Sequence, residues 1–420
     1  MEKDSTDFRD TDGTVALIEF NMTHAPACGM RPICAVLLAL LVAGCAHKSQ
    51  PDLPPSIPMA SPLPTTPAAS SVQATVEEEP QAQAVVVNSP QIQALPANPT
   101  PDSYANRDDA RRLARQLADQ QGLETDWAWQ TLSKARYKES VTRFIMPPPV
   151  GTPKNWTAYR GRFVEPIRIR AGVQFWREHR DTLSRAEQDY GVPAAVIVGV
   201  LGVETIYGRQ MGSFRALDAL TTLSLDFPRG RSDRSAFFQA ELGQLLKWCQ
   251  ETGTDPDTVL ASFAGAIGMP QFMPGSVRRY AVDFDRDGQV DLLRSPADAI
   301  GSVAHYLAEH GWVNGLPGYF DITPPSDPAS TAKLAEPDIL PSFTVAEMRA
   351  AGARLSPQLD NVSAKLALVT LQNGDAPPVY VAGTANFYAV TRYNQSSYYA
   401  LAVLQLGEAV QREAERTQTK

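Results

Sequence analysis

Apolar residues recur with helical spacing over most of the chain between residues 106 and 311. This pattern predicts helices over 106–121, 125–137, 167–190, 193–207, 216–225, 232–252 and 295–311. Short apolar and β-branched runs bounded by turn residues predict strands over 366–370, 379–381 and 387–391, before a closing helix that ends near residue 413. A short extended piece is expected over 157–166. The chain is therefore predicted to be mainly α with a small β portion, an α+β fold.

One predicted helix, 193–207, is almost entirely apolar. Residues 196–203 are apolar or glycine throughout, and a single carboxylate, Glu204, follows them in the last turn. Burial disfavours the ionised form of a carboxylate, and the partial negative charge at a helix C-terminus acts in the same direction. Both effects raise the pKa of Glu204, and a Glu that is protonated near neutral pH can act as a general acid. The alternative is a partly buried Glu paired with an arginine, and the local pattern alone favours it.

Small and uncharged polar residues are concentrated in the segment 262–274. Its glycines permit close approach of the backbone to another group. Ser262 and Gln271 supply hydrogen-bonding groups without charge. These properties suit a groove that binds a neutral polar ligand such as a sugar. A tightly packed helix crossing is the alternative interpretation.

Three aspartates at alternating positions, with a glycine in sixth position, match the first half of an EF-hand calcium loop. The twelfth position holds Arg294 where the motif has a bidentate Glu, and Val290 in eighth position suits the short strand of such loops. The predicted ligands of a structural Ca²⁺ are Asp283, Asp285, Asp287, the carbonyl oxygen of Gln289, and Asp298. An acidic turn that binds no metal is the alternative.

The first hundred residues are predicted to direct and tether the protein. Residues 1–44 are expected to be an upstream extension and a signal peptide, because the apolar run over 33–44 is too short to span a membrane. The run ends in Val-Ala-Gly-Cys, which resembles a bacterial lipobox, so Cys45 is the predicted site of lipidation. Residues 45–102 contain twelve prolines among Ser, Thr, Ala and Gln, a composition that indicates an extended linker.

The net charge and the cysteine content argue against nucleic-acid binding, a disulfide and a cysteine-based zinc site. The net charge of −8 offers no general basis for nucleic-acid binding. Two of the four cysteines precede Cys45, and Cys249 is expected to be buried, so neither a disulfide nor a cysteine zinc site is expected. We also expect no organic cofactor.

Five motifs follow one another in the chain. They are Gly-Val-Glu-Thr-x-Tyr-Gly-Arg over 202–209, Ala-Gly-Ala-x-Gly-x-Pro-Gln-Phe-Met-Pro over 264–274, the aspartate-rich loop, Asp-Ala-Ile-Gly-Ser-Val over 298–303 and Thr-Arg-Tyr-Asn over 391–394. Together they resemble the membrane-bound lytic murein transglycosylase B family. The resemblance implies a lysozyme-like helical core with an inserted EF-hand-like calcium loop. We expect an N-terminal helical region over 103–190, a catalytic core over 191–320, and a C-terminal region over 321–420 that completes the groove.

The resemblance also implies an activity on peptidoglycan. The β-1,4 bond between N-acetylmuramic acid and N-acetylglucosamine would be cleaved without water, leaving a 1,6-anhydromuramic end. Glu204 matches the single catalytic residue of the family, as acid and then as base. The positions that match its sugar groove are Ser262, Gln271, Arg229, Tyr306, Tyr393, Asn394, Tyr399 and Tyr159.

Two other functions stay open at this point. A hydrolytic muramidase of the same fold would need a second carboxylate or a held water, and Asp218 and Asp226 are the carboxylates near Glu204 in the sequence. A catalytically silent murein-binding lipoprotein is the other, although the intact Glu204 argues against it. In each case we expect a monomer at the periplasmic face of the bacterial outer membrane, held by a lipid anchor. Its partners would be peptidoglycan strands, with cell-wall synthesis proteins as a further candidate class.

Overall fold

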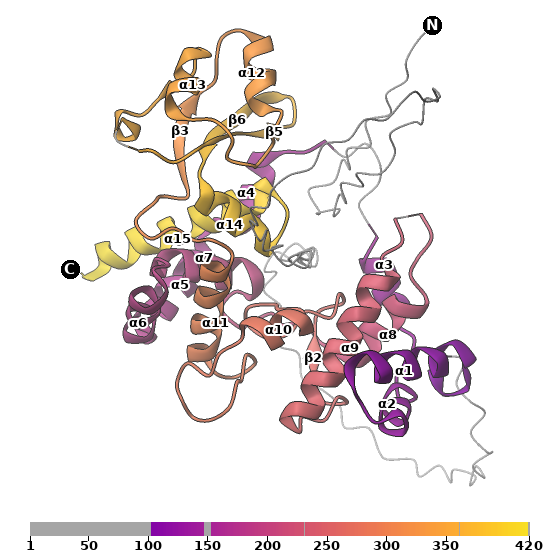
Figure 1. Ribbon diagram of the computed structural model, residues 1–420. Helices are drawn as coiled ribbons and strands as arrows, with labels where there is room; N and C mark the ends of the chain where they lie inside the picture. Colours follow the sequence, from indigo (N-terminus) through magenta and orange to yellow (C-terminus); the bar gives the residue numbers. More distant parts are fainter. Residues whose placement is uncertain (1–101, 147–152, 231, 361, 419–420) are drawn as a thin grey trace, which may run out of the picture. The chain divides into compact units, whose positions relative to one another are not determined.

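The computed structural model describes residues 102–146, 153–230, 232–360 and 362–418 (Figure 1). This part of the chain is mainly helical, with one two-stranded and one four-stranded antiparallel sheet, which confirms the predicted fold class. The predicted signal peptide, Cys45 and the linker up to residue 101 lie outside the described residues. No helix in the described ranges is both long and apolar enough to cross a membrane.

The described residues form two compact units. The helical unit consists of residues 102–146, 160–315 and 402–418, and the sheet unit of residues 153–159 and 316–401, with the gaps given above. Each unit thus combines segments that are far apart in the sequence. The predicted division into three consecutive regions stays a prediction.

The helical unit contains most of the helices. Its elements are η1 (Tyr104–Asn106), α1 (Asp108–Gln121), α2 (Thr125–Leu132), α3 (Glu139–Phe144), α5 (Pro166–Glu178), α6 (Arg180–Tyr190), α7 (Ala194–Thr205), β1 (Phe214–Arg215), α8 (Ala216–Leu225), α9 (Ser235–Thr252), β2 (Leu260–Ala261), α10 (Pro274–Tyr280) and α11 (Pro296–Glu309). Two further helices, α4 (Trp156–Phe163) and α15 (Ser397–Gln418), have residues in both units.

The sheet unit is built on a four-stranded antiparallel sheet with the strand order β4-β3-β6-β5. Its elements are β3 (Tyr319–Thr323), α12 (Pro328–Ala335), α13 (Val345–Ala350), β4 (Arg354–Leu355), η2 (Pro357–Leu359), β5 (Ala367–Asn373), β6 (Ala376–Gly383) and α14 (Ala385–Tyr393). The strand register places Phe320, Ala382 and Leu368 side by side. These three side chains share one core with Leu334 of α12 and Met348 of α13, so the two helices cover one face of the sheet.

Helix prediction was most accurate where the apolar period was clear. Helix α8 spans the predicted range 216–225, and the helices predicted over 106–121, 193–207, 232–252 and 295–311 are present with shifts of a few residues at their ends. The strands predicted over 366–370 and 379–381 are present as β5 and β6.

Three other predictions were wrong. The helix expected over 167–190 is divided into α5 and α6, because His179 has non-helical dihedral angles of φ −117° and ψ 25°. The extended piece expected over 157–166 is helical in α4 and the start of α5. The strand expected over 387–391 lies in helix α14, where the Thr384 hydroxyl accepts the N–H of Asn386 as an N-cap. This cap and the burial of the apolar side chains of α14 override the β-propensity of the segment.

Helix α7 is the buried element of the helical unit. All of its residues except Glu204 are buried, and it packs against α5, α6, α11 and α15. A side chain on Gly199 would overlap the carbonyl oxygen of Val403, and one on Gly407 would overlap the carbonyl oxygen of Ala195. The backbones of α7 and α15 are therefore in direct contact, which only glycine permits at these two positions.

A buried carboxylate joins α9 to α10. Glu241 of α9 is 6% exposed, and its Oε2 accepts the N–H of Gly275 in the first turn of α10 at 2.7 Å. Arg279 is the charged group that faces it from α10. Burial raises the pKa of Glu241 to about 7, while the Gly275 N–H and the Arg279 charge act in the opposite direction.

The contact between α7 and α15 predicts that a larger residue at the crossing destabilises the protein. We expect Gly407→Ala to lower the free energy of unfolding by about 1–3 kcal/mol, because the added methyl group forces two backbones apart. Urea unfolding followed by circular dichroism measures the change. Gly161→Ala in α4 is the matched control, since nothing lies within 4 Å of a Cβ there. If Gly407→Ala lowers the free energy of unfolding no more than Gly161→Ala does, the result would contradict the contact.

The raised pKa of Glu241 predicts how the free energy of unfolding depends on pH. In the unfolded chain its carboxyl ionises near the ordinary pKa of 4.5, but in the folded protein only near 7. The wild type therefore loses stability as the pH rises through this window, by roughly 3 kcal/mol in all. Glu241→Gln cannot ionise, so its free energy of unfolding should rise relative to that of the wild type over the same window. Urea unfolding of both proteins at intervals across that window tests this, and a constant difference would refute it.

Candidate active site and metal loop

Glu204 occupies the last turn of the buried helix α7 and is itself half-buried. The helix ends one residue later, and the next three residues, Ile206, Tyr207 and Gly208, have φ angles of 50°, 57° and 84°. Left-handed conformations of non-glycine residues cost energy and are found where surrounding structure holds them. The N–H groups of Ile206 and Tyr207 satisfy carbonyls in the last turns of α7. The chain therefore turns sharply away directly after Glu204.

Thr205 links this turn to the segment 262–274. Its hydroxyl donates to the carbonyl oxygen of Met269 at 2.9 Å and accepts the N–H of Gly208 at 3.0 Å. The side chain of Thr205 is fully buried. This role of Thr205 was not predicted from the sequence, although a hydroxyl residue at the end of an otherwise apolar helix is a signal that points to such a link.

Two predicted groove residues, Ser262 and Gln271, lie in one hydrogen-bonded turn. The Ser262 hydroxyl accepts the N–H of Ala266 at 3.1 Å, and Ile267 and Phe272 exchange backbone hydrogen bonds. Gln271 is left-handed with φ 52°, and its amide nitrogen donates to the carbonyl oxygen of Met211 at 3.2 Å. The turn is thus connected to the loop that follows Glu204 at a second point.

The other predicted groove residues of the helical unit differ in exposure. Arg229 is exposed in the loop after α8. Tyr306 is only 6% exposed and packs against Phe272, Tyr280 and His310, with ring centroids 5.4, 4.9 and 3.9 Å away. Arg229 is thus accessible in this structure, whereas Tyr306 supports the turn through Phe272.

The remaining predicted groove residues belong to the sheet unit. The rings of Tyr393 and Tyr399 are stacked, with centroids 6.3 Å apart. Tyr159 packs on Tyr398 at 5.6 Å. Asn394 is 2% exposed, and its Oδ1 has no hydrogen-bond partner among the described residues. Such an atom is rare in native structures and is a candidate acceptor for a ligand donor.

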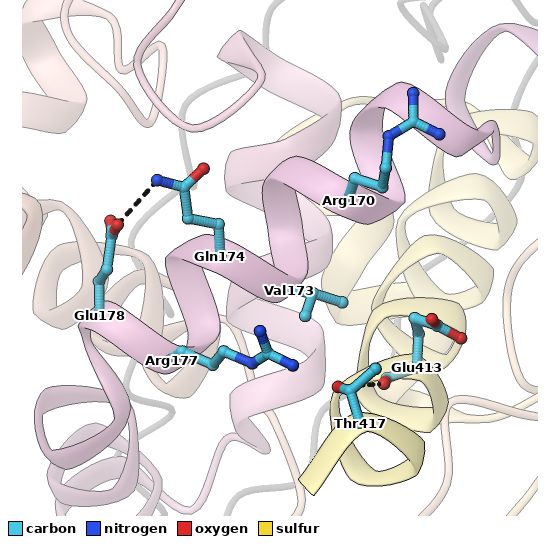
Figure 2. A pocket seen from close by; sticks show the side chains of 7 residues that line it. All are labelled: Arg170, Val173, Gln174, Arg177, Glu178, Glu413 and Thr417. Carbon is cyan, nitrogen blue, oxygen red and sulfur yellow. Dashed lines mark hydrogen bonds between the residues drawn. The ribbon is translucent and has the colours of Figure 1, made fainter. Parts of the chain in front are cut away.

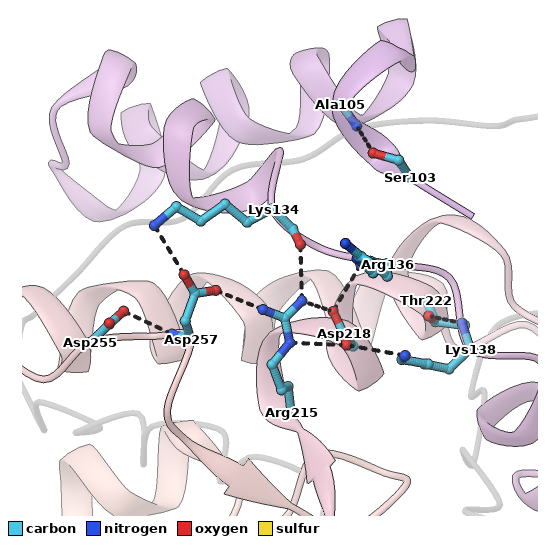
Figure 3. A network of polar contacts seen from close by, with 10 residues as sticks. All are labelled: Ser103, Ala105, Lys134, Arg136, Lys138, Arg215, Asp218, Thr222, Asp255 and Asp257. Atoms are coloured by element: carbon cyan, nitrogen blue, oxygen red, sulfur yellow. Dashed lines mark hydrogen bonds and ion pairs between the residues drawn. The ribbon is translucent and has the colours of Figure 1, made fainter. Parts of the chain in front are cut away.

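The two aspartates considered as a second catalytic carboxylate are both engaged elsewhere. Asp218 is 2% exposed and accepts hydrogen bonds from the Arg136 N–H at 2.8 Å and from the Arg215 guanidinium at 2.5 and 3.1 Å (Figure 3). Asp226 accepts from the Tyr104 hydroxyl at 2.5 Å and from Arg107 at 2.7 Å. Both carboxylates hold the segment from residue 102 to 138 against α8, which does not favour the hydrolytic alternative.

The aspartate-rich loop joins α10 to α11 and brings three carboxylates together. One ligand oxygen each of Asp283, Asp285 and Asp287 lies within 4.8 Å of the others. Asp283 accepts the N–H groups of Asp287 and Gly288 at 3.1 and 2.8 Å, and Gly288 has φ 94°. This set of hard carboxylate oxygens on a tight loop fits Ca²⁺. The short strand predicted at Val290 is absent from the described loop, because no backbone partner pairs with it.

Asp298 and Gln289 occupy different positions around this loop. Asp298 is 1% exposed, and its two oxygens accept the N–H groups of Phe284 and Asp291 at 2.7 and 2.8 Å. It therefore holds the two ends of the loop together, and its role as a direct ligand stays a prediction. Gln289 is exposed, and its N–H donates to Asp287 at 2.9 Å.

A separate cavity of about 380 Å³ lies between α5 and the end of α15 (Figure 2). Its lining residues are Arg170, Val173, Gln174, Arg177, Glu178, Glu413 and Thr417. The Gln174 amide donates to Glu178 at 2.8 Å. The predicted catalytic, groove and metal-binding residues do not line this cavity, so it is distinct from the candidate site.

Comparison with known proteins agrees with this geometry. The model of the transglycosylase SLT domain family matches residues 105–408. The membrane-bound lytic murein transglycosylase B of Escherichia coli K12 is 38% identical over 320 residues, which cover 73% of this chain and 84% of that protein.

Two solved structures are also similar to this chain. The catenated lytic transglycosylase SltB1 of Pseudomonas aeruginosa has a TM-score of 0.66 and 37% identity, covering 74% of this chain and 99% of that one. The Escherichia coli lytic transglycosylase Slt35 in complex with calcium has a TM-score of 0.63 and 38% identity, covering 74% and 95%. This chain therefore belongs to the membrane-bound lytic murein transglycosylase B family, whose domain is the transglycosylase SLT domain.

Proposed function

We propose that this protein is a peptidoglycan lytic transglycosylase. It cleaves the β-1,4 bond between N-acetylmuramic acid and N-acetylglucosamine and leaves 1,6-anhydromuramic ends. The observation on which this depends is the position of Glu204, the one residue of α7 that is not buried, in a chain of this family. An ordinary glycosidase needs two carboxylates, and the engagement of Asp218 and Asp226 in ion pairs favours a reaction that needs one.

Glu204 acts first as an acid and then as a base. Its carboxyl donates a proton to the glycosidic oxygen while the bond from that oxygen to C1 of the muramic residue breaks. The resulting carboxylate then takes the proton of the muramic 6-hydroxyl as O6 bonds to C1. Glu204 returns to its protonated form and no water is consumed. Because the nucleophile belongs to the substrate, proximity supplies much of the rate.

Sugar contacts come from hydrogen-bonding and aromatic side chains. In the helical unit we assign them to Ser262, Gln271, Arg229 and Tyr306, and in the sheet unit to Tyr159, Tyr393, Asn394 and Tyr399. No donor from the described residues reaches the buried Oδ1 of Asn394, which supports a contact with an N–H group such as that of an N-acetyl substituent. Tyrosine rings provide flat apolar faces with a polar edge, which suit sugar rings.

The loop between α10 and α11 would hold a structural Ca²⁺. Its ligands would be Asp283, Asp285, Asp287, the carbonyl oxygen of Gln289, and Asp298, which also joins the two ends of the loop. The cation would offset the repulsion between the neighbouring carboxylates. The calcium in the related Slt35 structure supports this assignment.

The protein is anchored at the periplasmic face of the outer membrane. Cys45 carries the lipid, and the proline-rich linker up to residue 102 separates it from the folded units. The name of the Escherichia coli relative describes that protein as membrane-bound, which supports this location. The protein acts as a monomer on peptidoglycan strands, and cell-wall synthesis proteins are candidate partners.

The catalytic role predicts that Glu204→Gln abolishes turnover. The glutamine keeps the shape of the side chain but can neither donate nor accept the proton, so the rate should fall by at least about 10²-fold. Mass spectrometry of the products released from purified peptidoglycan is the measurement, with full-length wild type and variant.

The same measurement separates the alternatives. Anhydro-ended products from the wild type alone would support the proposal. Reducing-ended products, heavier by one water, would indicate a hydrolase. Binding without cleavage by either protein would indicate a silent murein-binding protein.

The metal assignment predicts that Ca²⁺ stabilises the wild type against heat. At a concentration one hundred times its Kd, a ligand of the folded state adds about 2.7 kcal/mol to the free energy of unfolding. Asp285→Asn removes one ligand charge and should abolish most of the rise in Tm on adding Ca²⁺ after chelation. Asp375→Asn, an exposed carboxylate in the β5–β6 turn, is the control and should keep the rise. If the Tm of the wild type does not change when Ca²⁺ is added, the result would refute the site.

A further inference from the structure

We propose that Thr205 is a positioning residue whose hydroxyl holds Glu204 in register with the turn that contains Ser262 and Gln271. The inference rests on the proposed function, in which Glu204 is the acid and base. It concerns a residue that does not itself react. Its effect is to fix where the reacting carboxylate lies.

The hydroxyl of Thr205 connects three parts of the chain through one oxygen atom. The side chain belongs to the last residue of α7, next to Glu204. As a donor it binds the Met269 carbonyl at 2.9 Å, and as an acceptor it binds the Gly208 N–H at 3.0 Å. Because the side chain is fully buried, water cannot replace either partner at low cost.

The backbone around Thr205 needs such a link. Ile206, Tyr207 and Gly208 are consecutive left-handed residues, a conformation that two of them adopt at an energetic cost. The hydrogen bond from the Gly208 N–H ends this run at the Thr205 side chain. Backbone hydrogen bonds from Ile206 and Tyr207 to α7 also hold this turn, and the Thr205 hydroxyl adds the link to its last residue, Gly208.

On the other side, Thr205 contacts the turn that contains the sugar-binding residues. Met269 lies between Gly268, whose φ is 72°, and Pro270, two residues before the left-handed Gln271. The Gln271 amide donates to the Met211 carbonyl at 3.2 Å. Thr205 and Gln271 thus form two links between the same pair of segments, one from each side. A displacement of either segment would change the position of Glu204 relative to Gln271.

Catalysis is sensitive to such a displacement. A misplacement of about 1 Å at the reacting group can lower a rate about 10²-fold. Substrate binding depends on many contacts and should change less. The loss of the Thr205 hydroxyl should therefore appear in kcat and not in KM.

The test compares four full-length proteins: wild type, Thr205→Val, Thr205→Ser and Thr221→Val. Valine keeps the shape of threonine and removes the hydroxyl's hydrogen bonds with Met269, with Gly208 and, at 3.4 Å, with the Leu201 carbonyl oxygen, whereas serine keeps the hydroxyl. Thr221 is the matched control, because it is equally buried but its hydroxyl has no hydrogen-bond partner among the described residues. Release of anhydro-ended products from soluble glycan strands gives kcat and KM, below the Tm of every variant. Amide hydrogen exchange of Gly208 gives a second readout that does not depend on turnover.

We expect Thr205→Val to lower kcat by about 10²-fold with KM within about twofold, and to raise the exchange rate of the Gly208 amide. Thr205→Ser should keep most of the wild-type kcat and an exchange rate of the Gly208 amide close to that of the wild type. Thr221→Val should match the wild type in both measurements. Wild-type kcat in Thr205→Val, or equal losses in the serine and valine variants, would overturn the positioning role. A wild type that releases no anhydro-ended product would instead overturn the proposed function, and the exchange measurement would still test the hydrogen bond.

Discussion

The helical unit depends on the burial of one apolar helix, α7, on all sides. Eleven consecutive or near-consecutive apolar, small or hydroxyl residues leave water together, and each fully buried aliphatic side chain contributes about 1.5–3 kcal/mol. Glycines at the crossing with α15 bring the two backbones into contact. A helix packed this closely has no room for a charge along its length. The carboxylate of Glu204 can therefore be accommodated only at its end.

The position of Glu204 at the end of α7 is accompanied by strain in the backbone that follows it. Ile206, Tyr207 and Gln271 are non-glycine residues with left-handed φ angles, and all three lie in the two segments around the candidate site. Strain of this kind persists where hydrogen bonds and packing determine the conformation. Here the hydroxyl of Thr205 and the amide of Gln271 supply hydrogen bonds of this kind, so the two segments are joined at two points.

Carboxylates in this protein are divided among different roles by their surroundings. Asp218 and Asp226 are paired with arginines and hold the N-terminal helices. Glu241 is buried beside a helix start, with its pKa raised. The aspartates of the loop before α11 lie close together, an arrangement that a bound cation would stabilise. Glu204 lies in the last turn of α7 and is the one half-buried residue of that helix.

Local pattern determined the helices with a clear apolar period, such as α1, α7 and α8, and the motifs that identify the family. It could not determine α14, where β-forming residues are helical because an N-cap and burial prevail, nor the break at His179. The residues of β3 and α12 lie in the range 317–341, which its local pattern indicated to be loop-rich, because their pairing and packing partners are distant in sequence. The aspartate spacing predicted the metal loop with Asp298 as a member, but only the fold shows that Asp298 accepts the N–H groups of Phe284 and Asp291 at the two ends of the loop. Likewise, Glu204 was evident from its apolar neighbours, whereas the link from Thr205 to Met269 spans 64 positions and exists only in the folded protein.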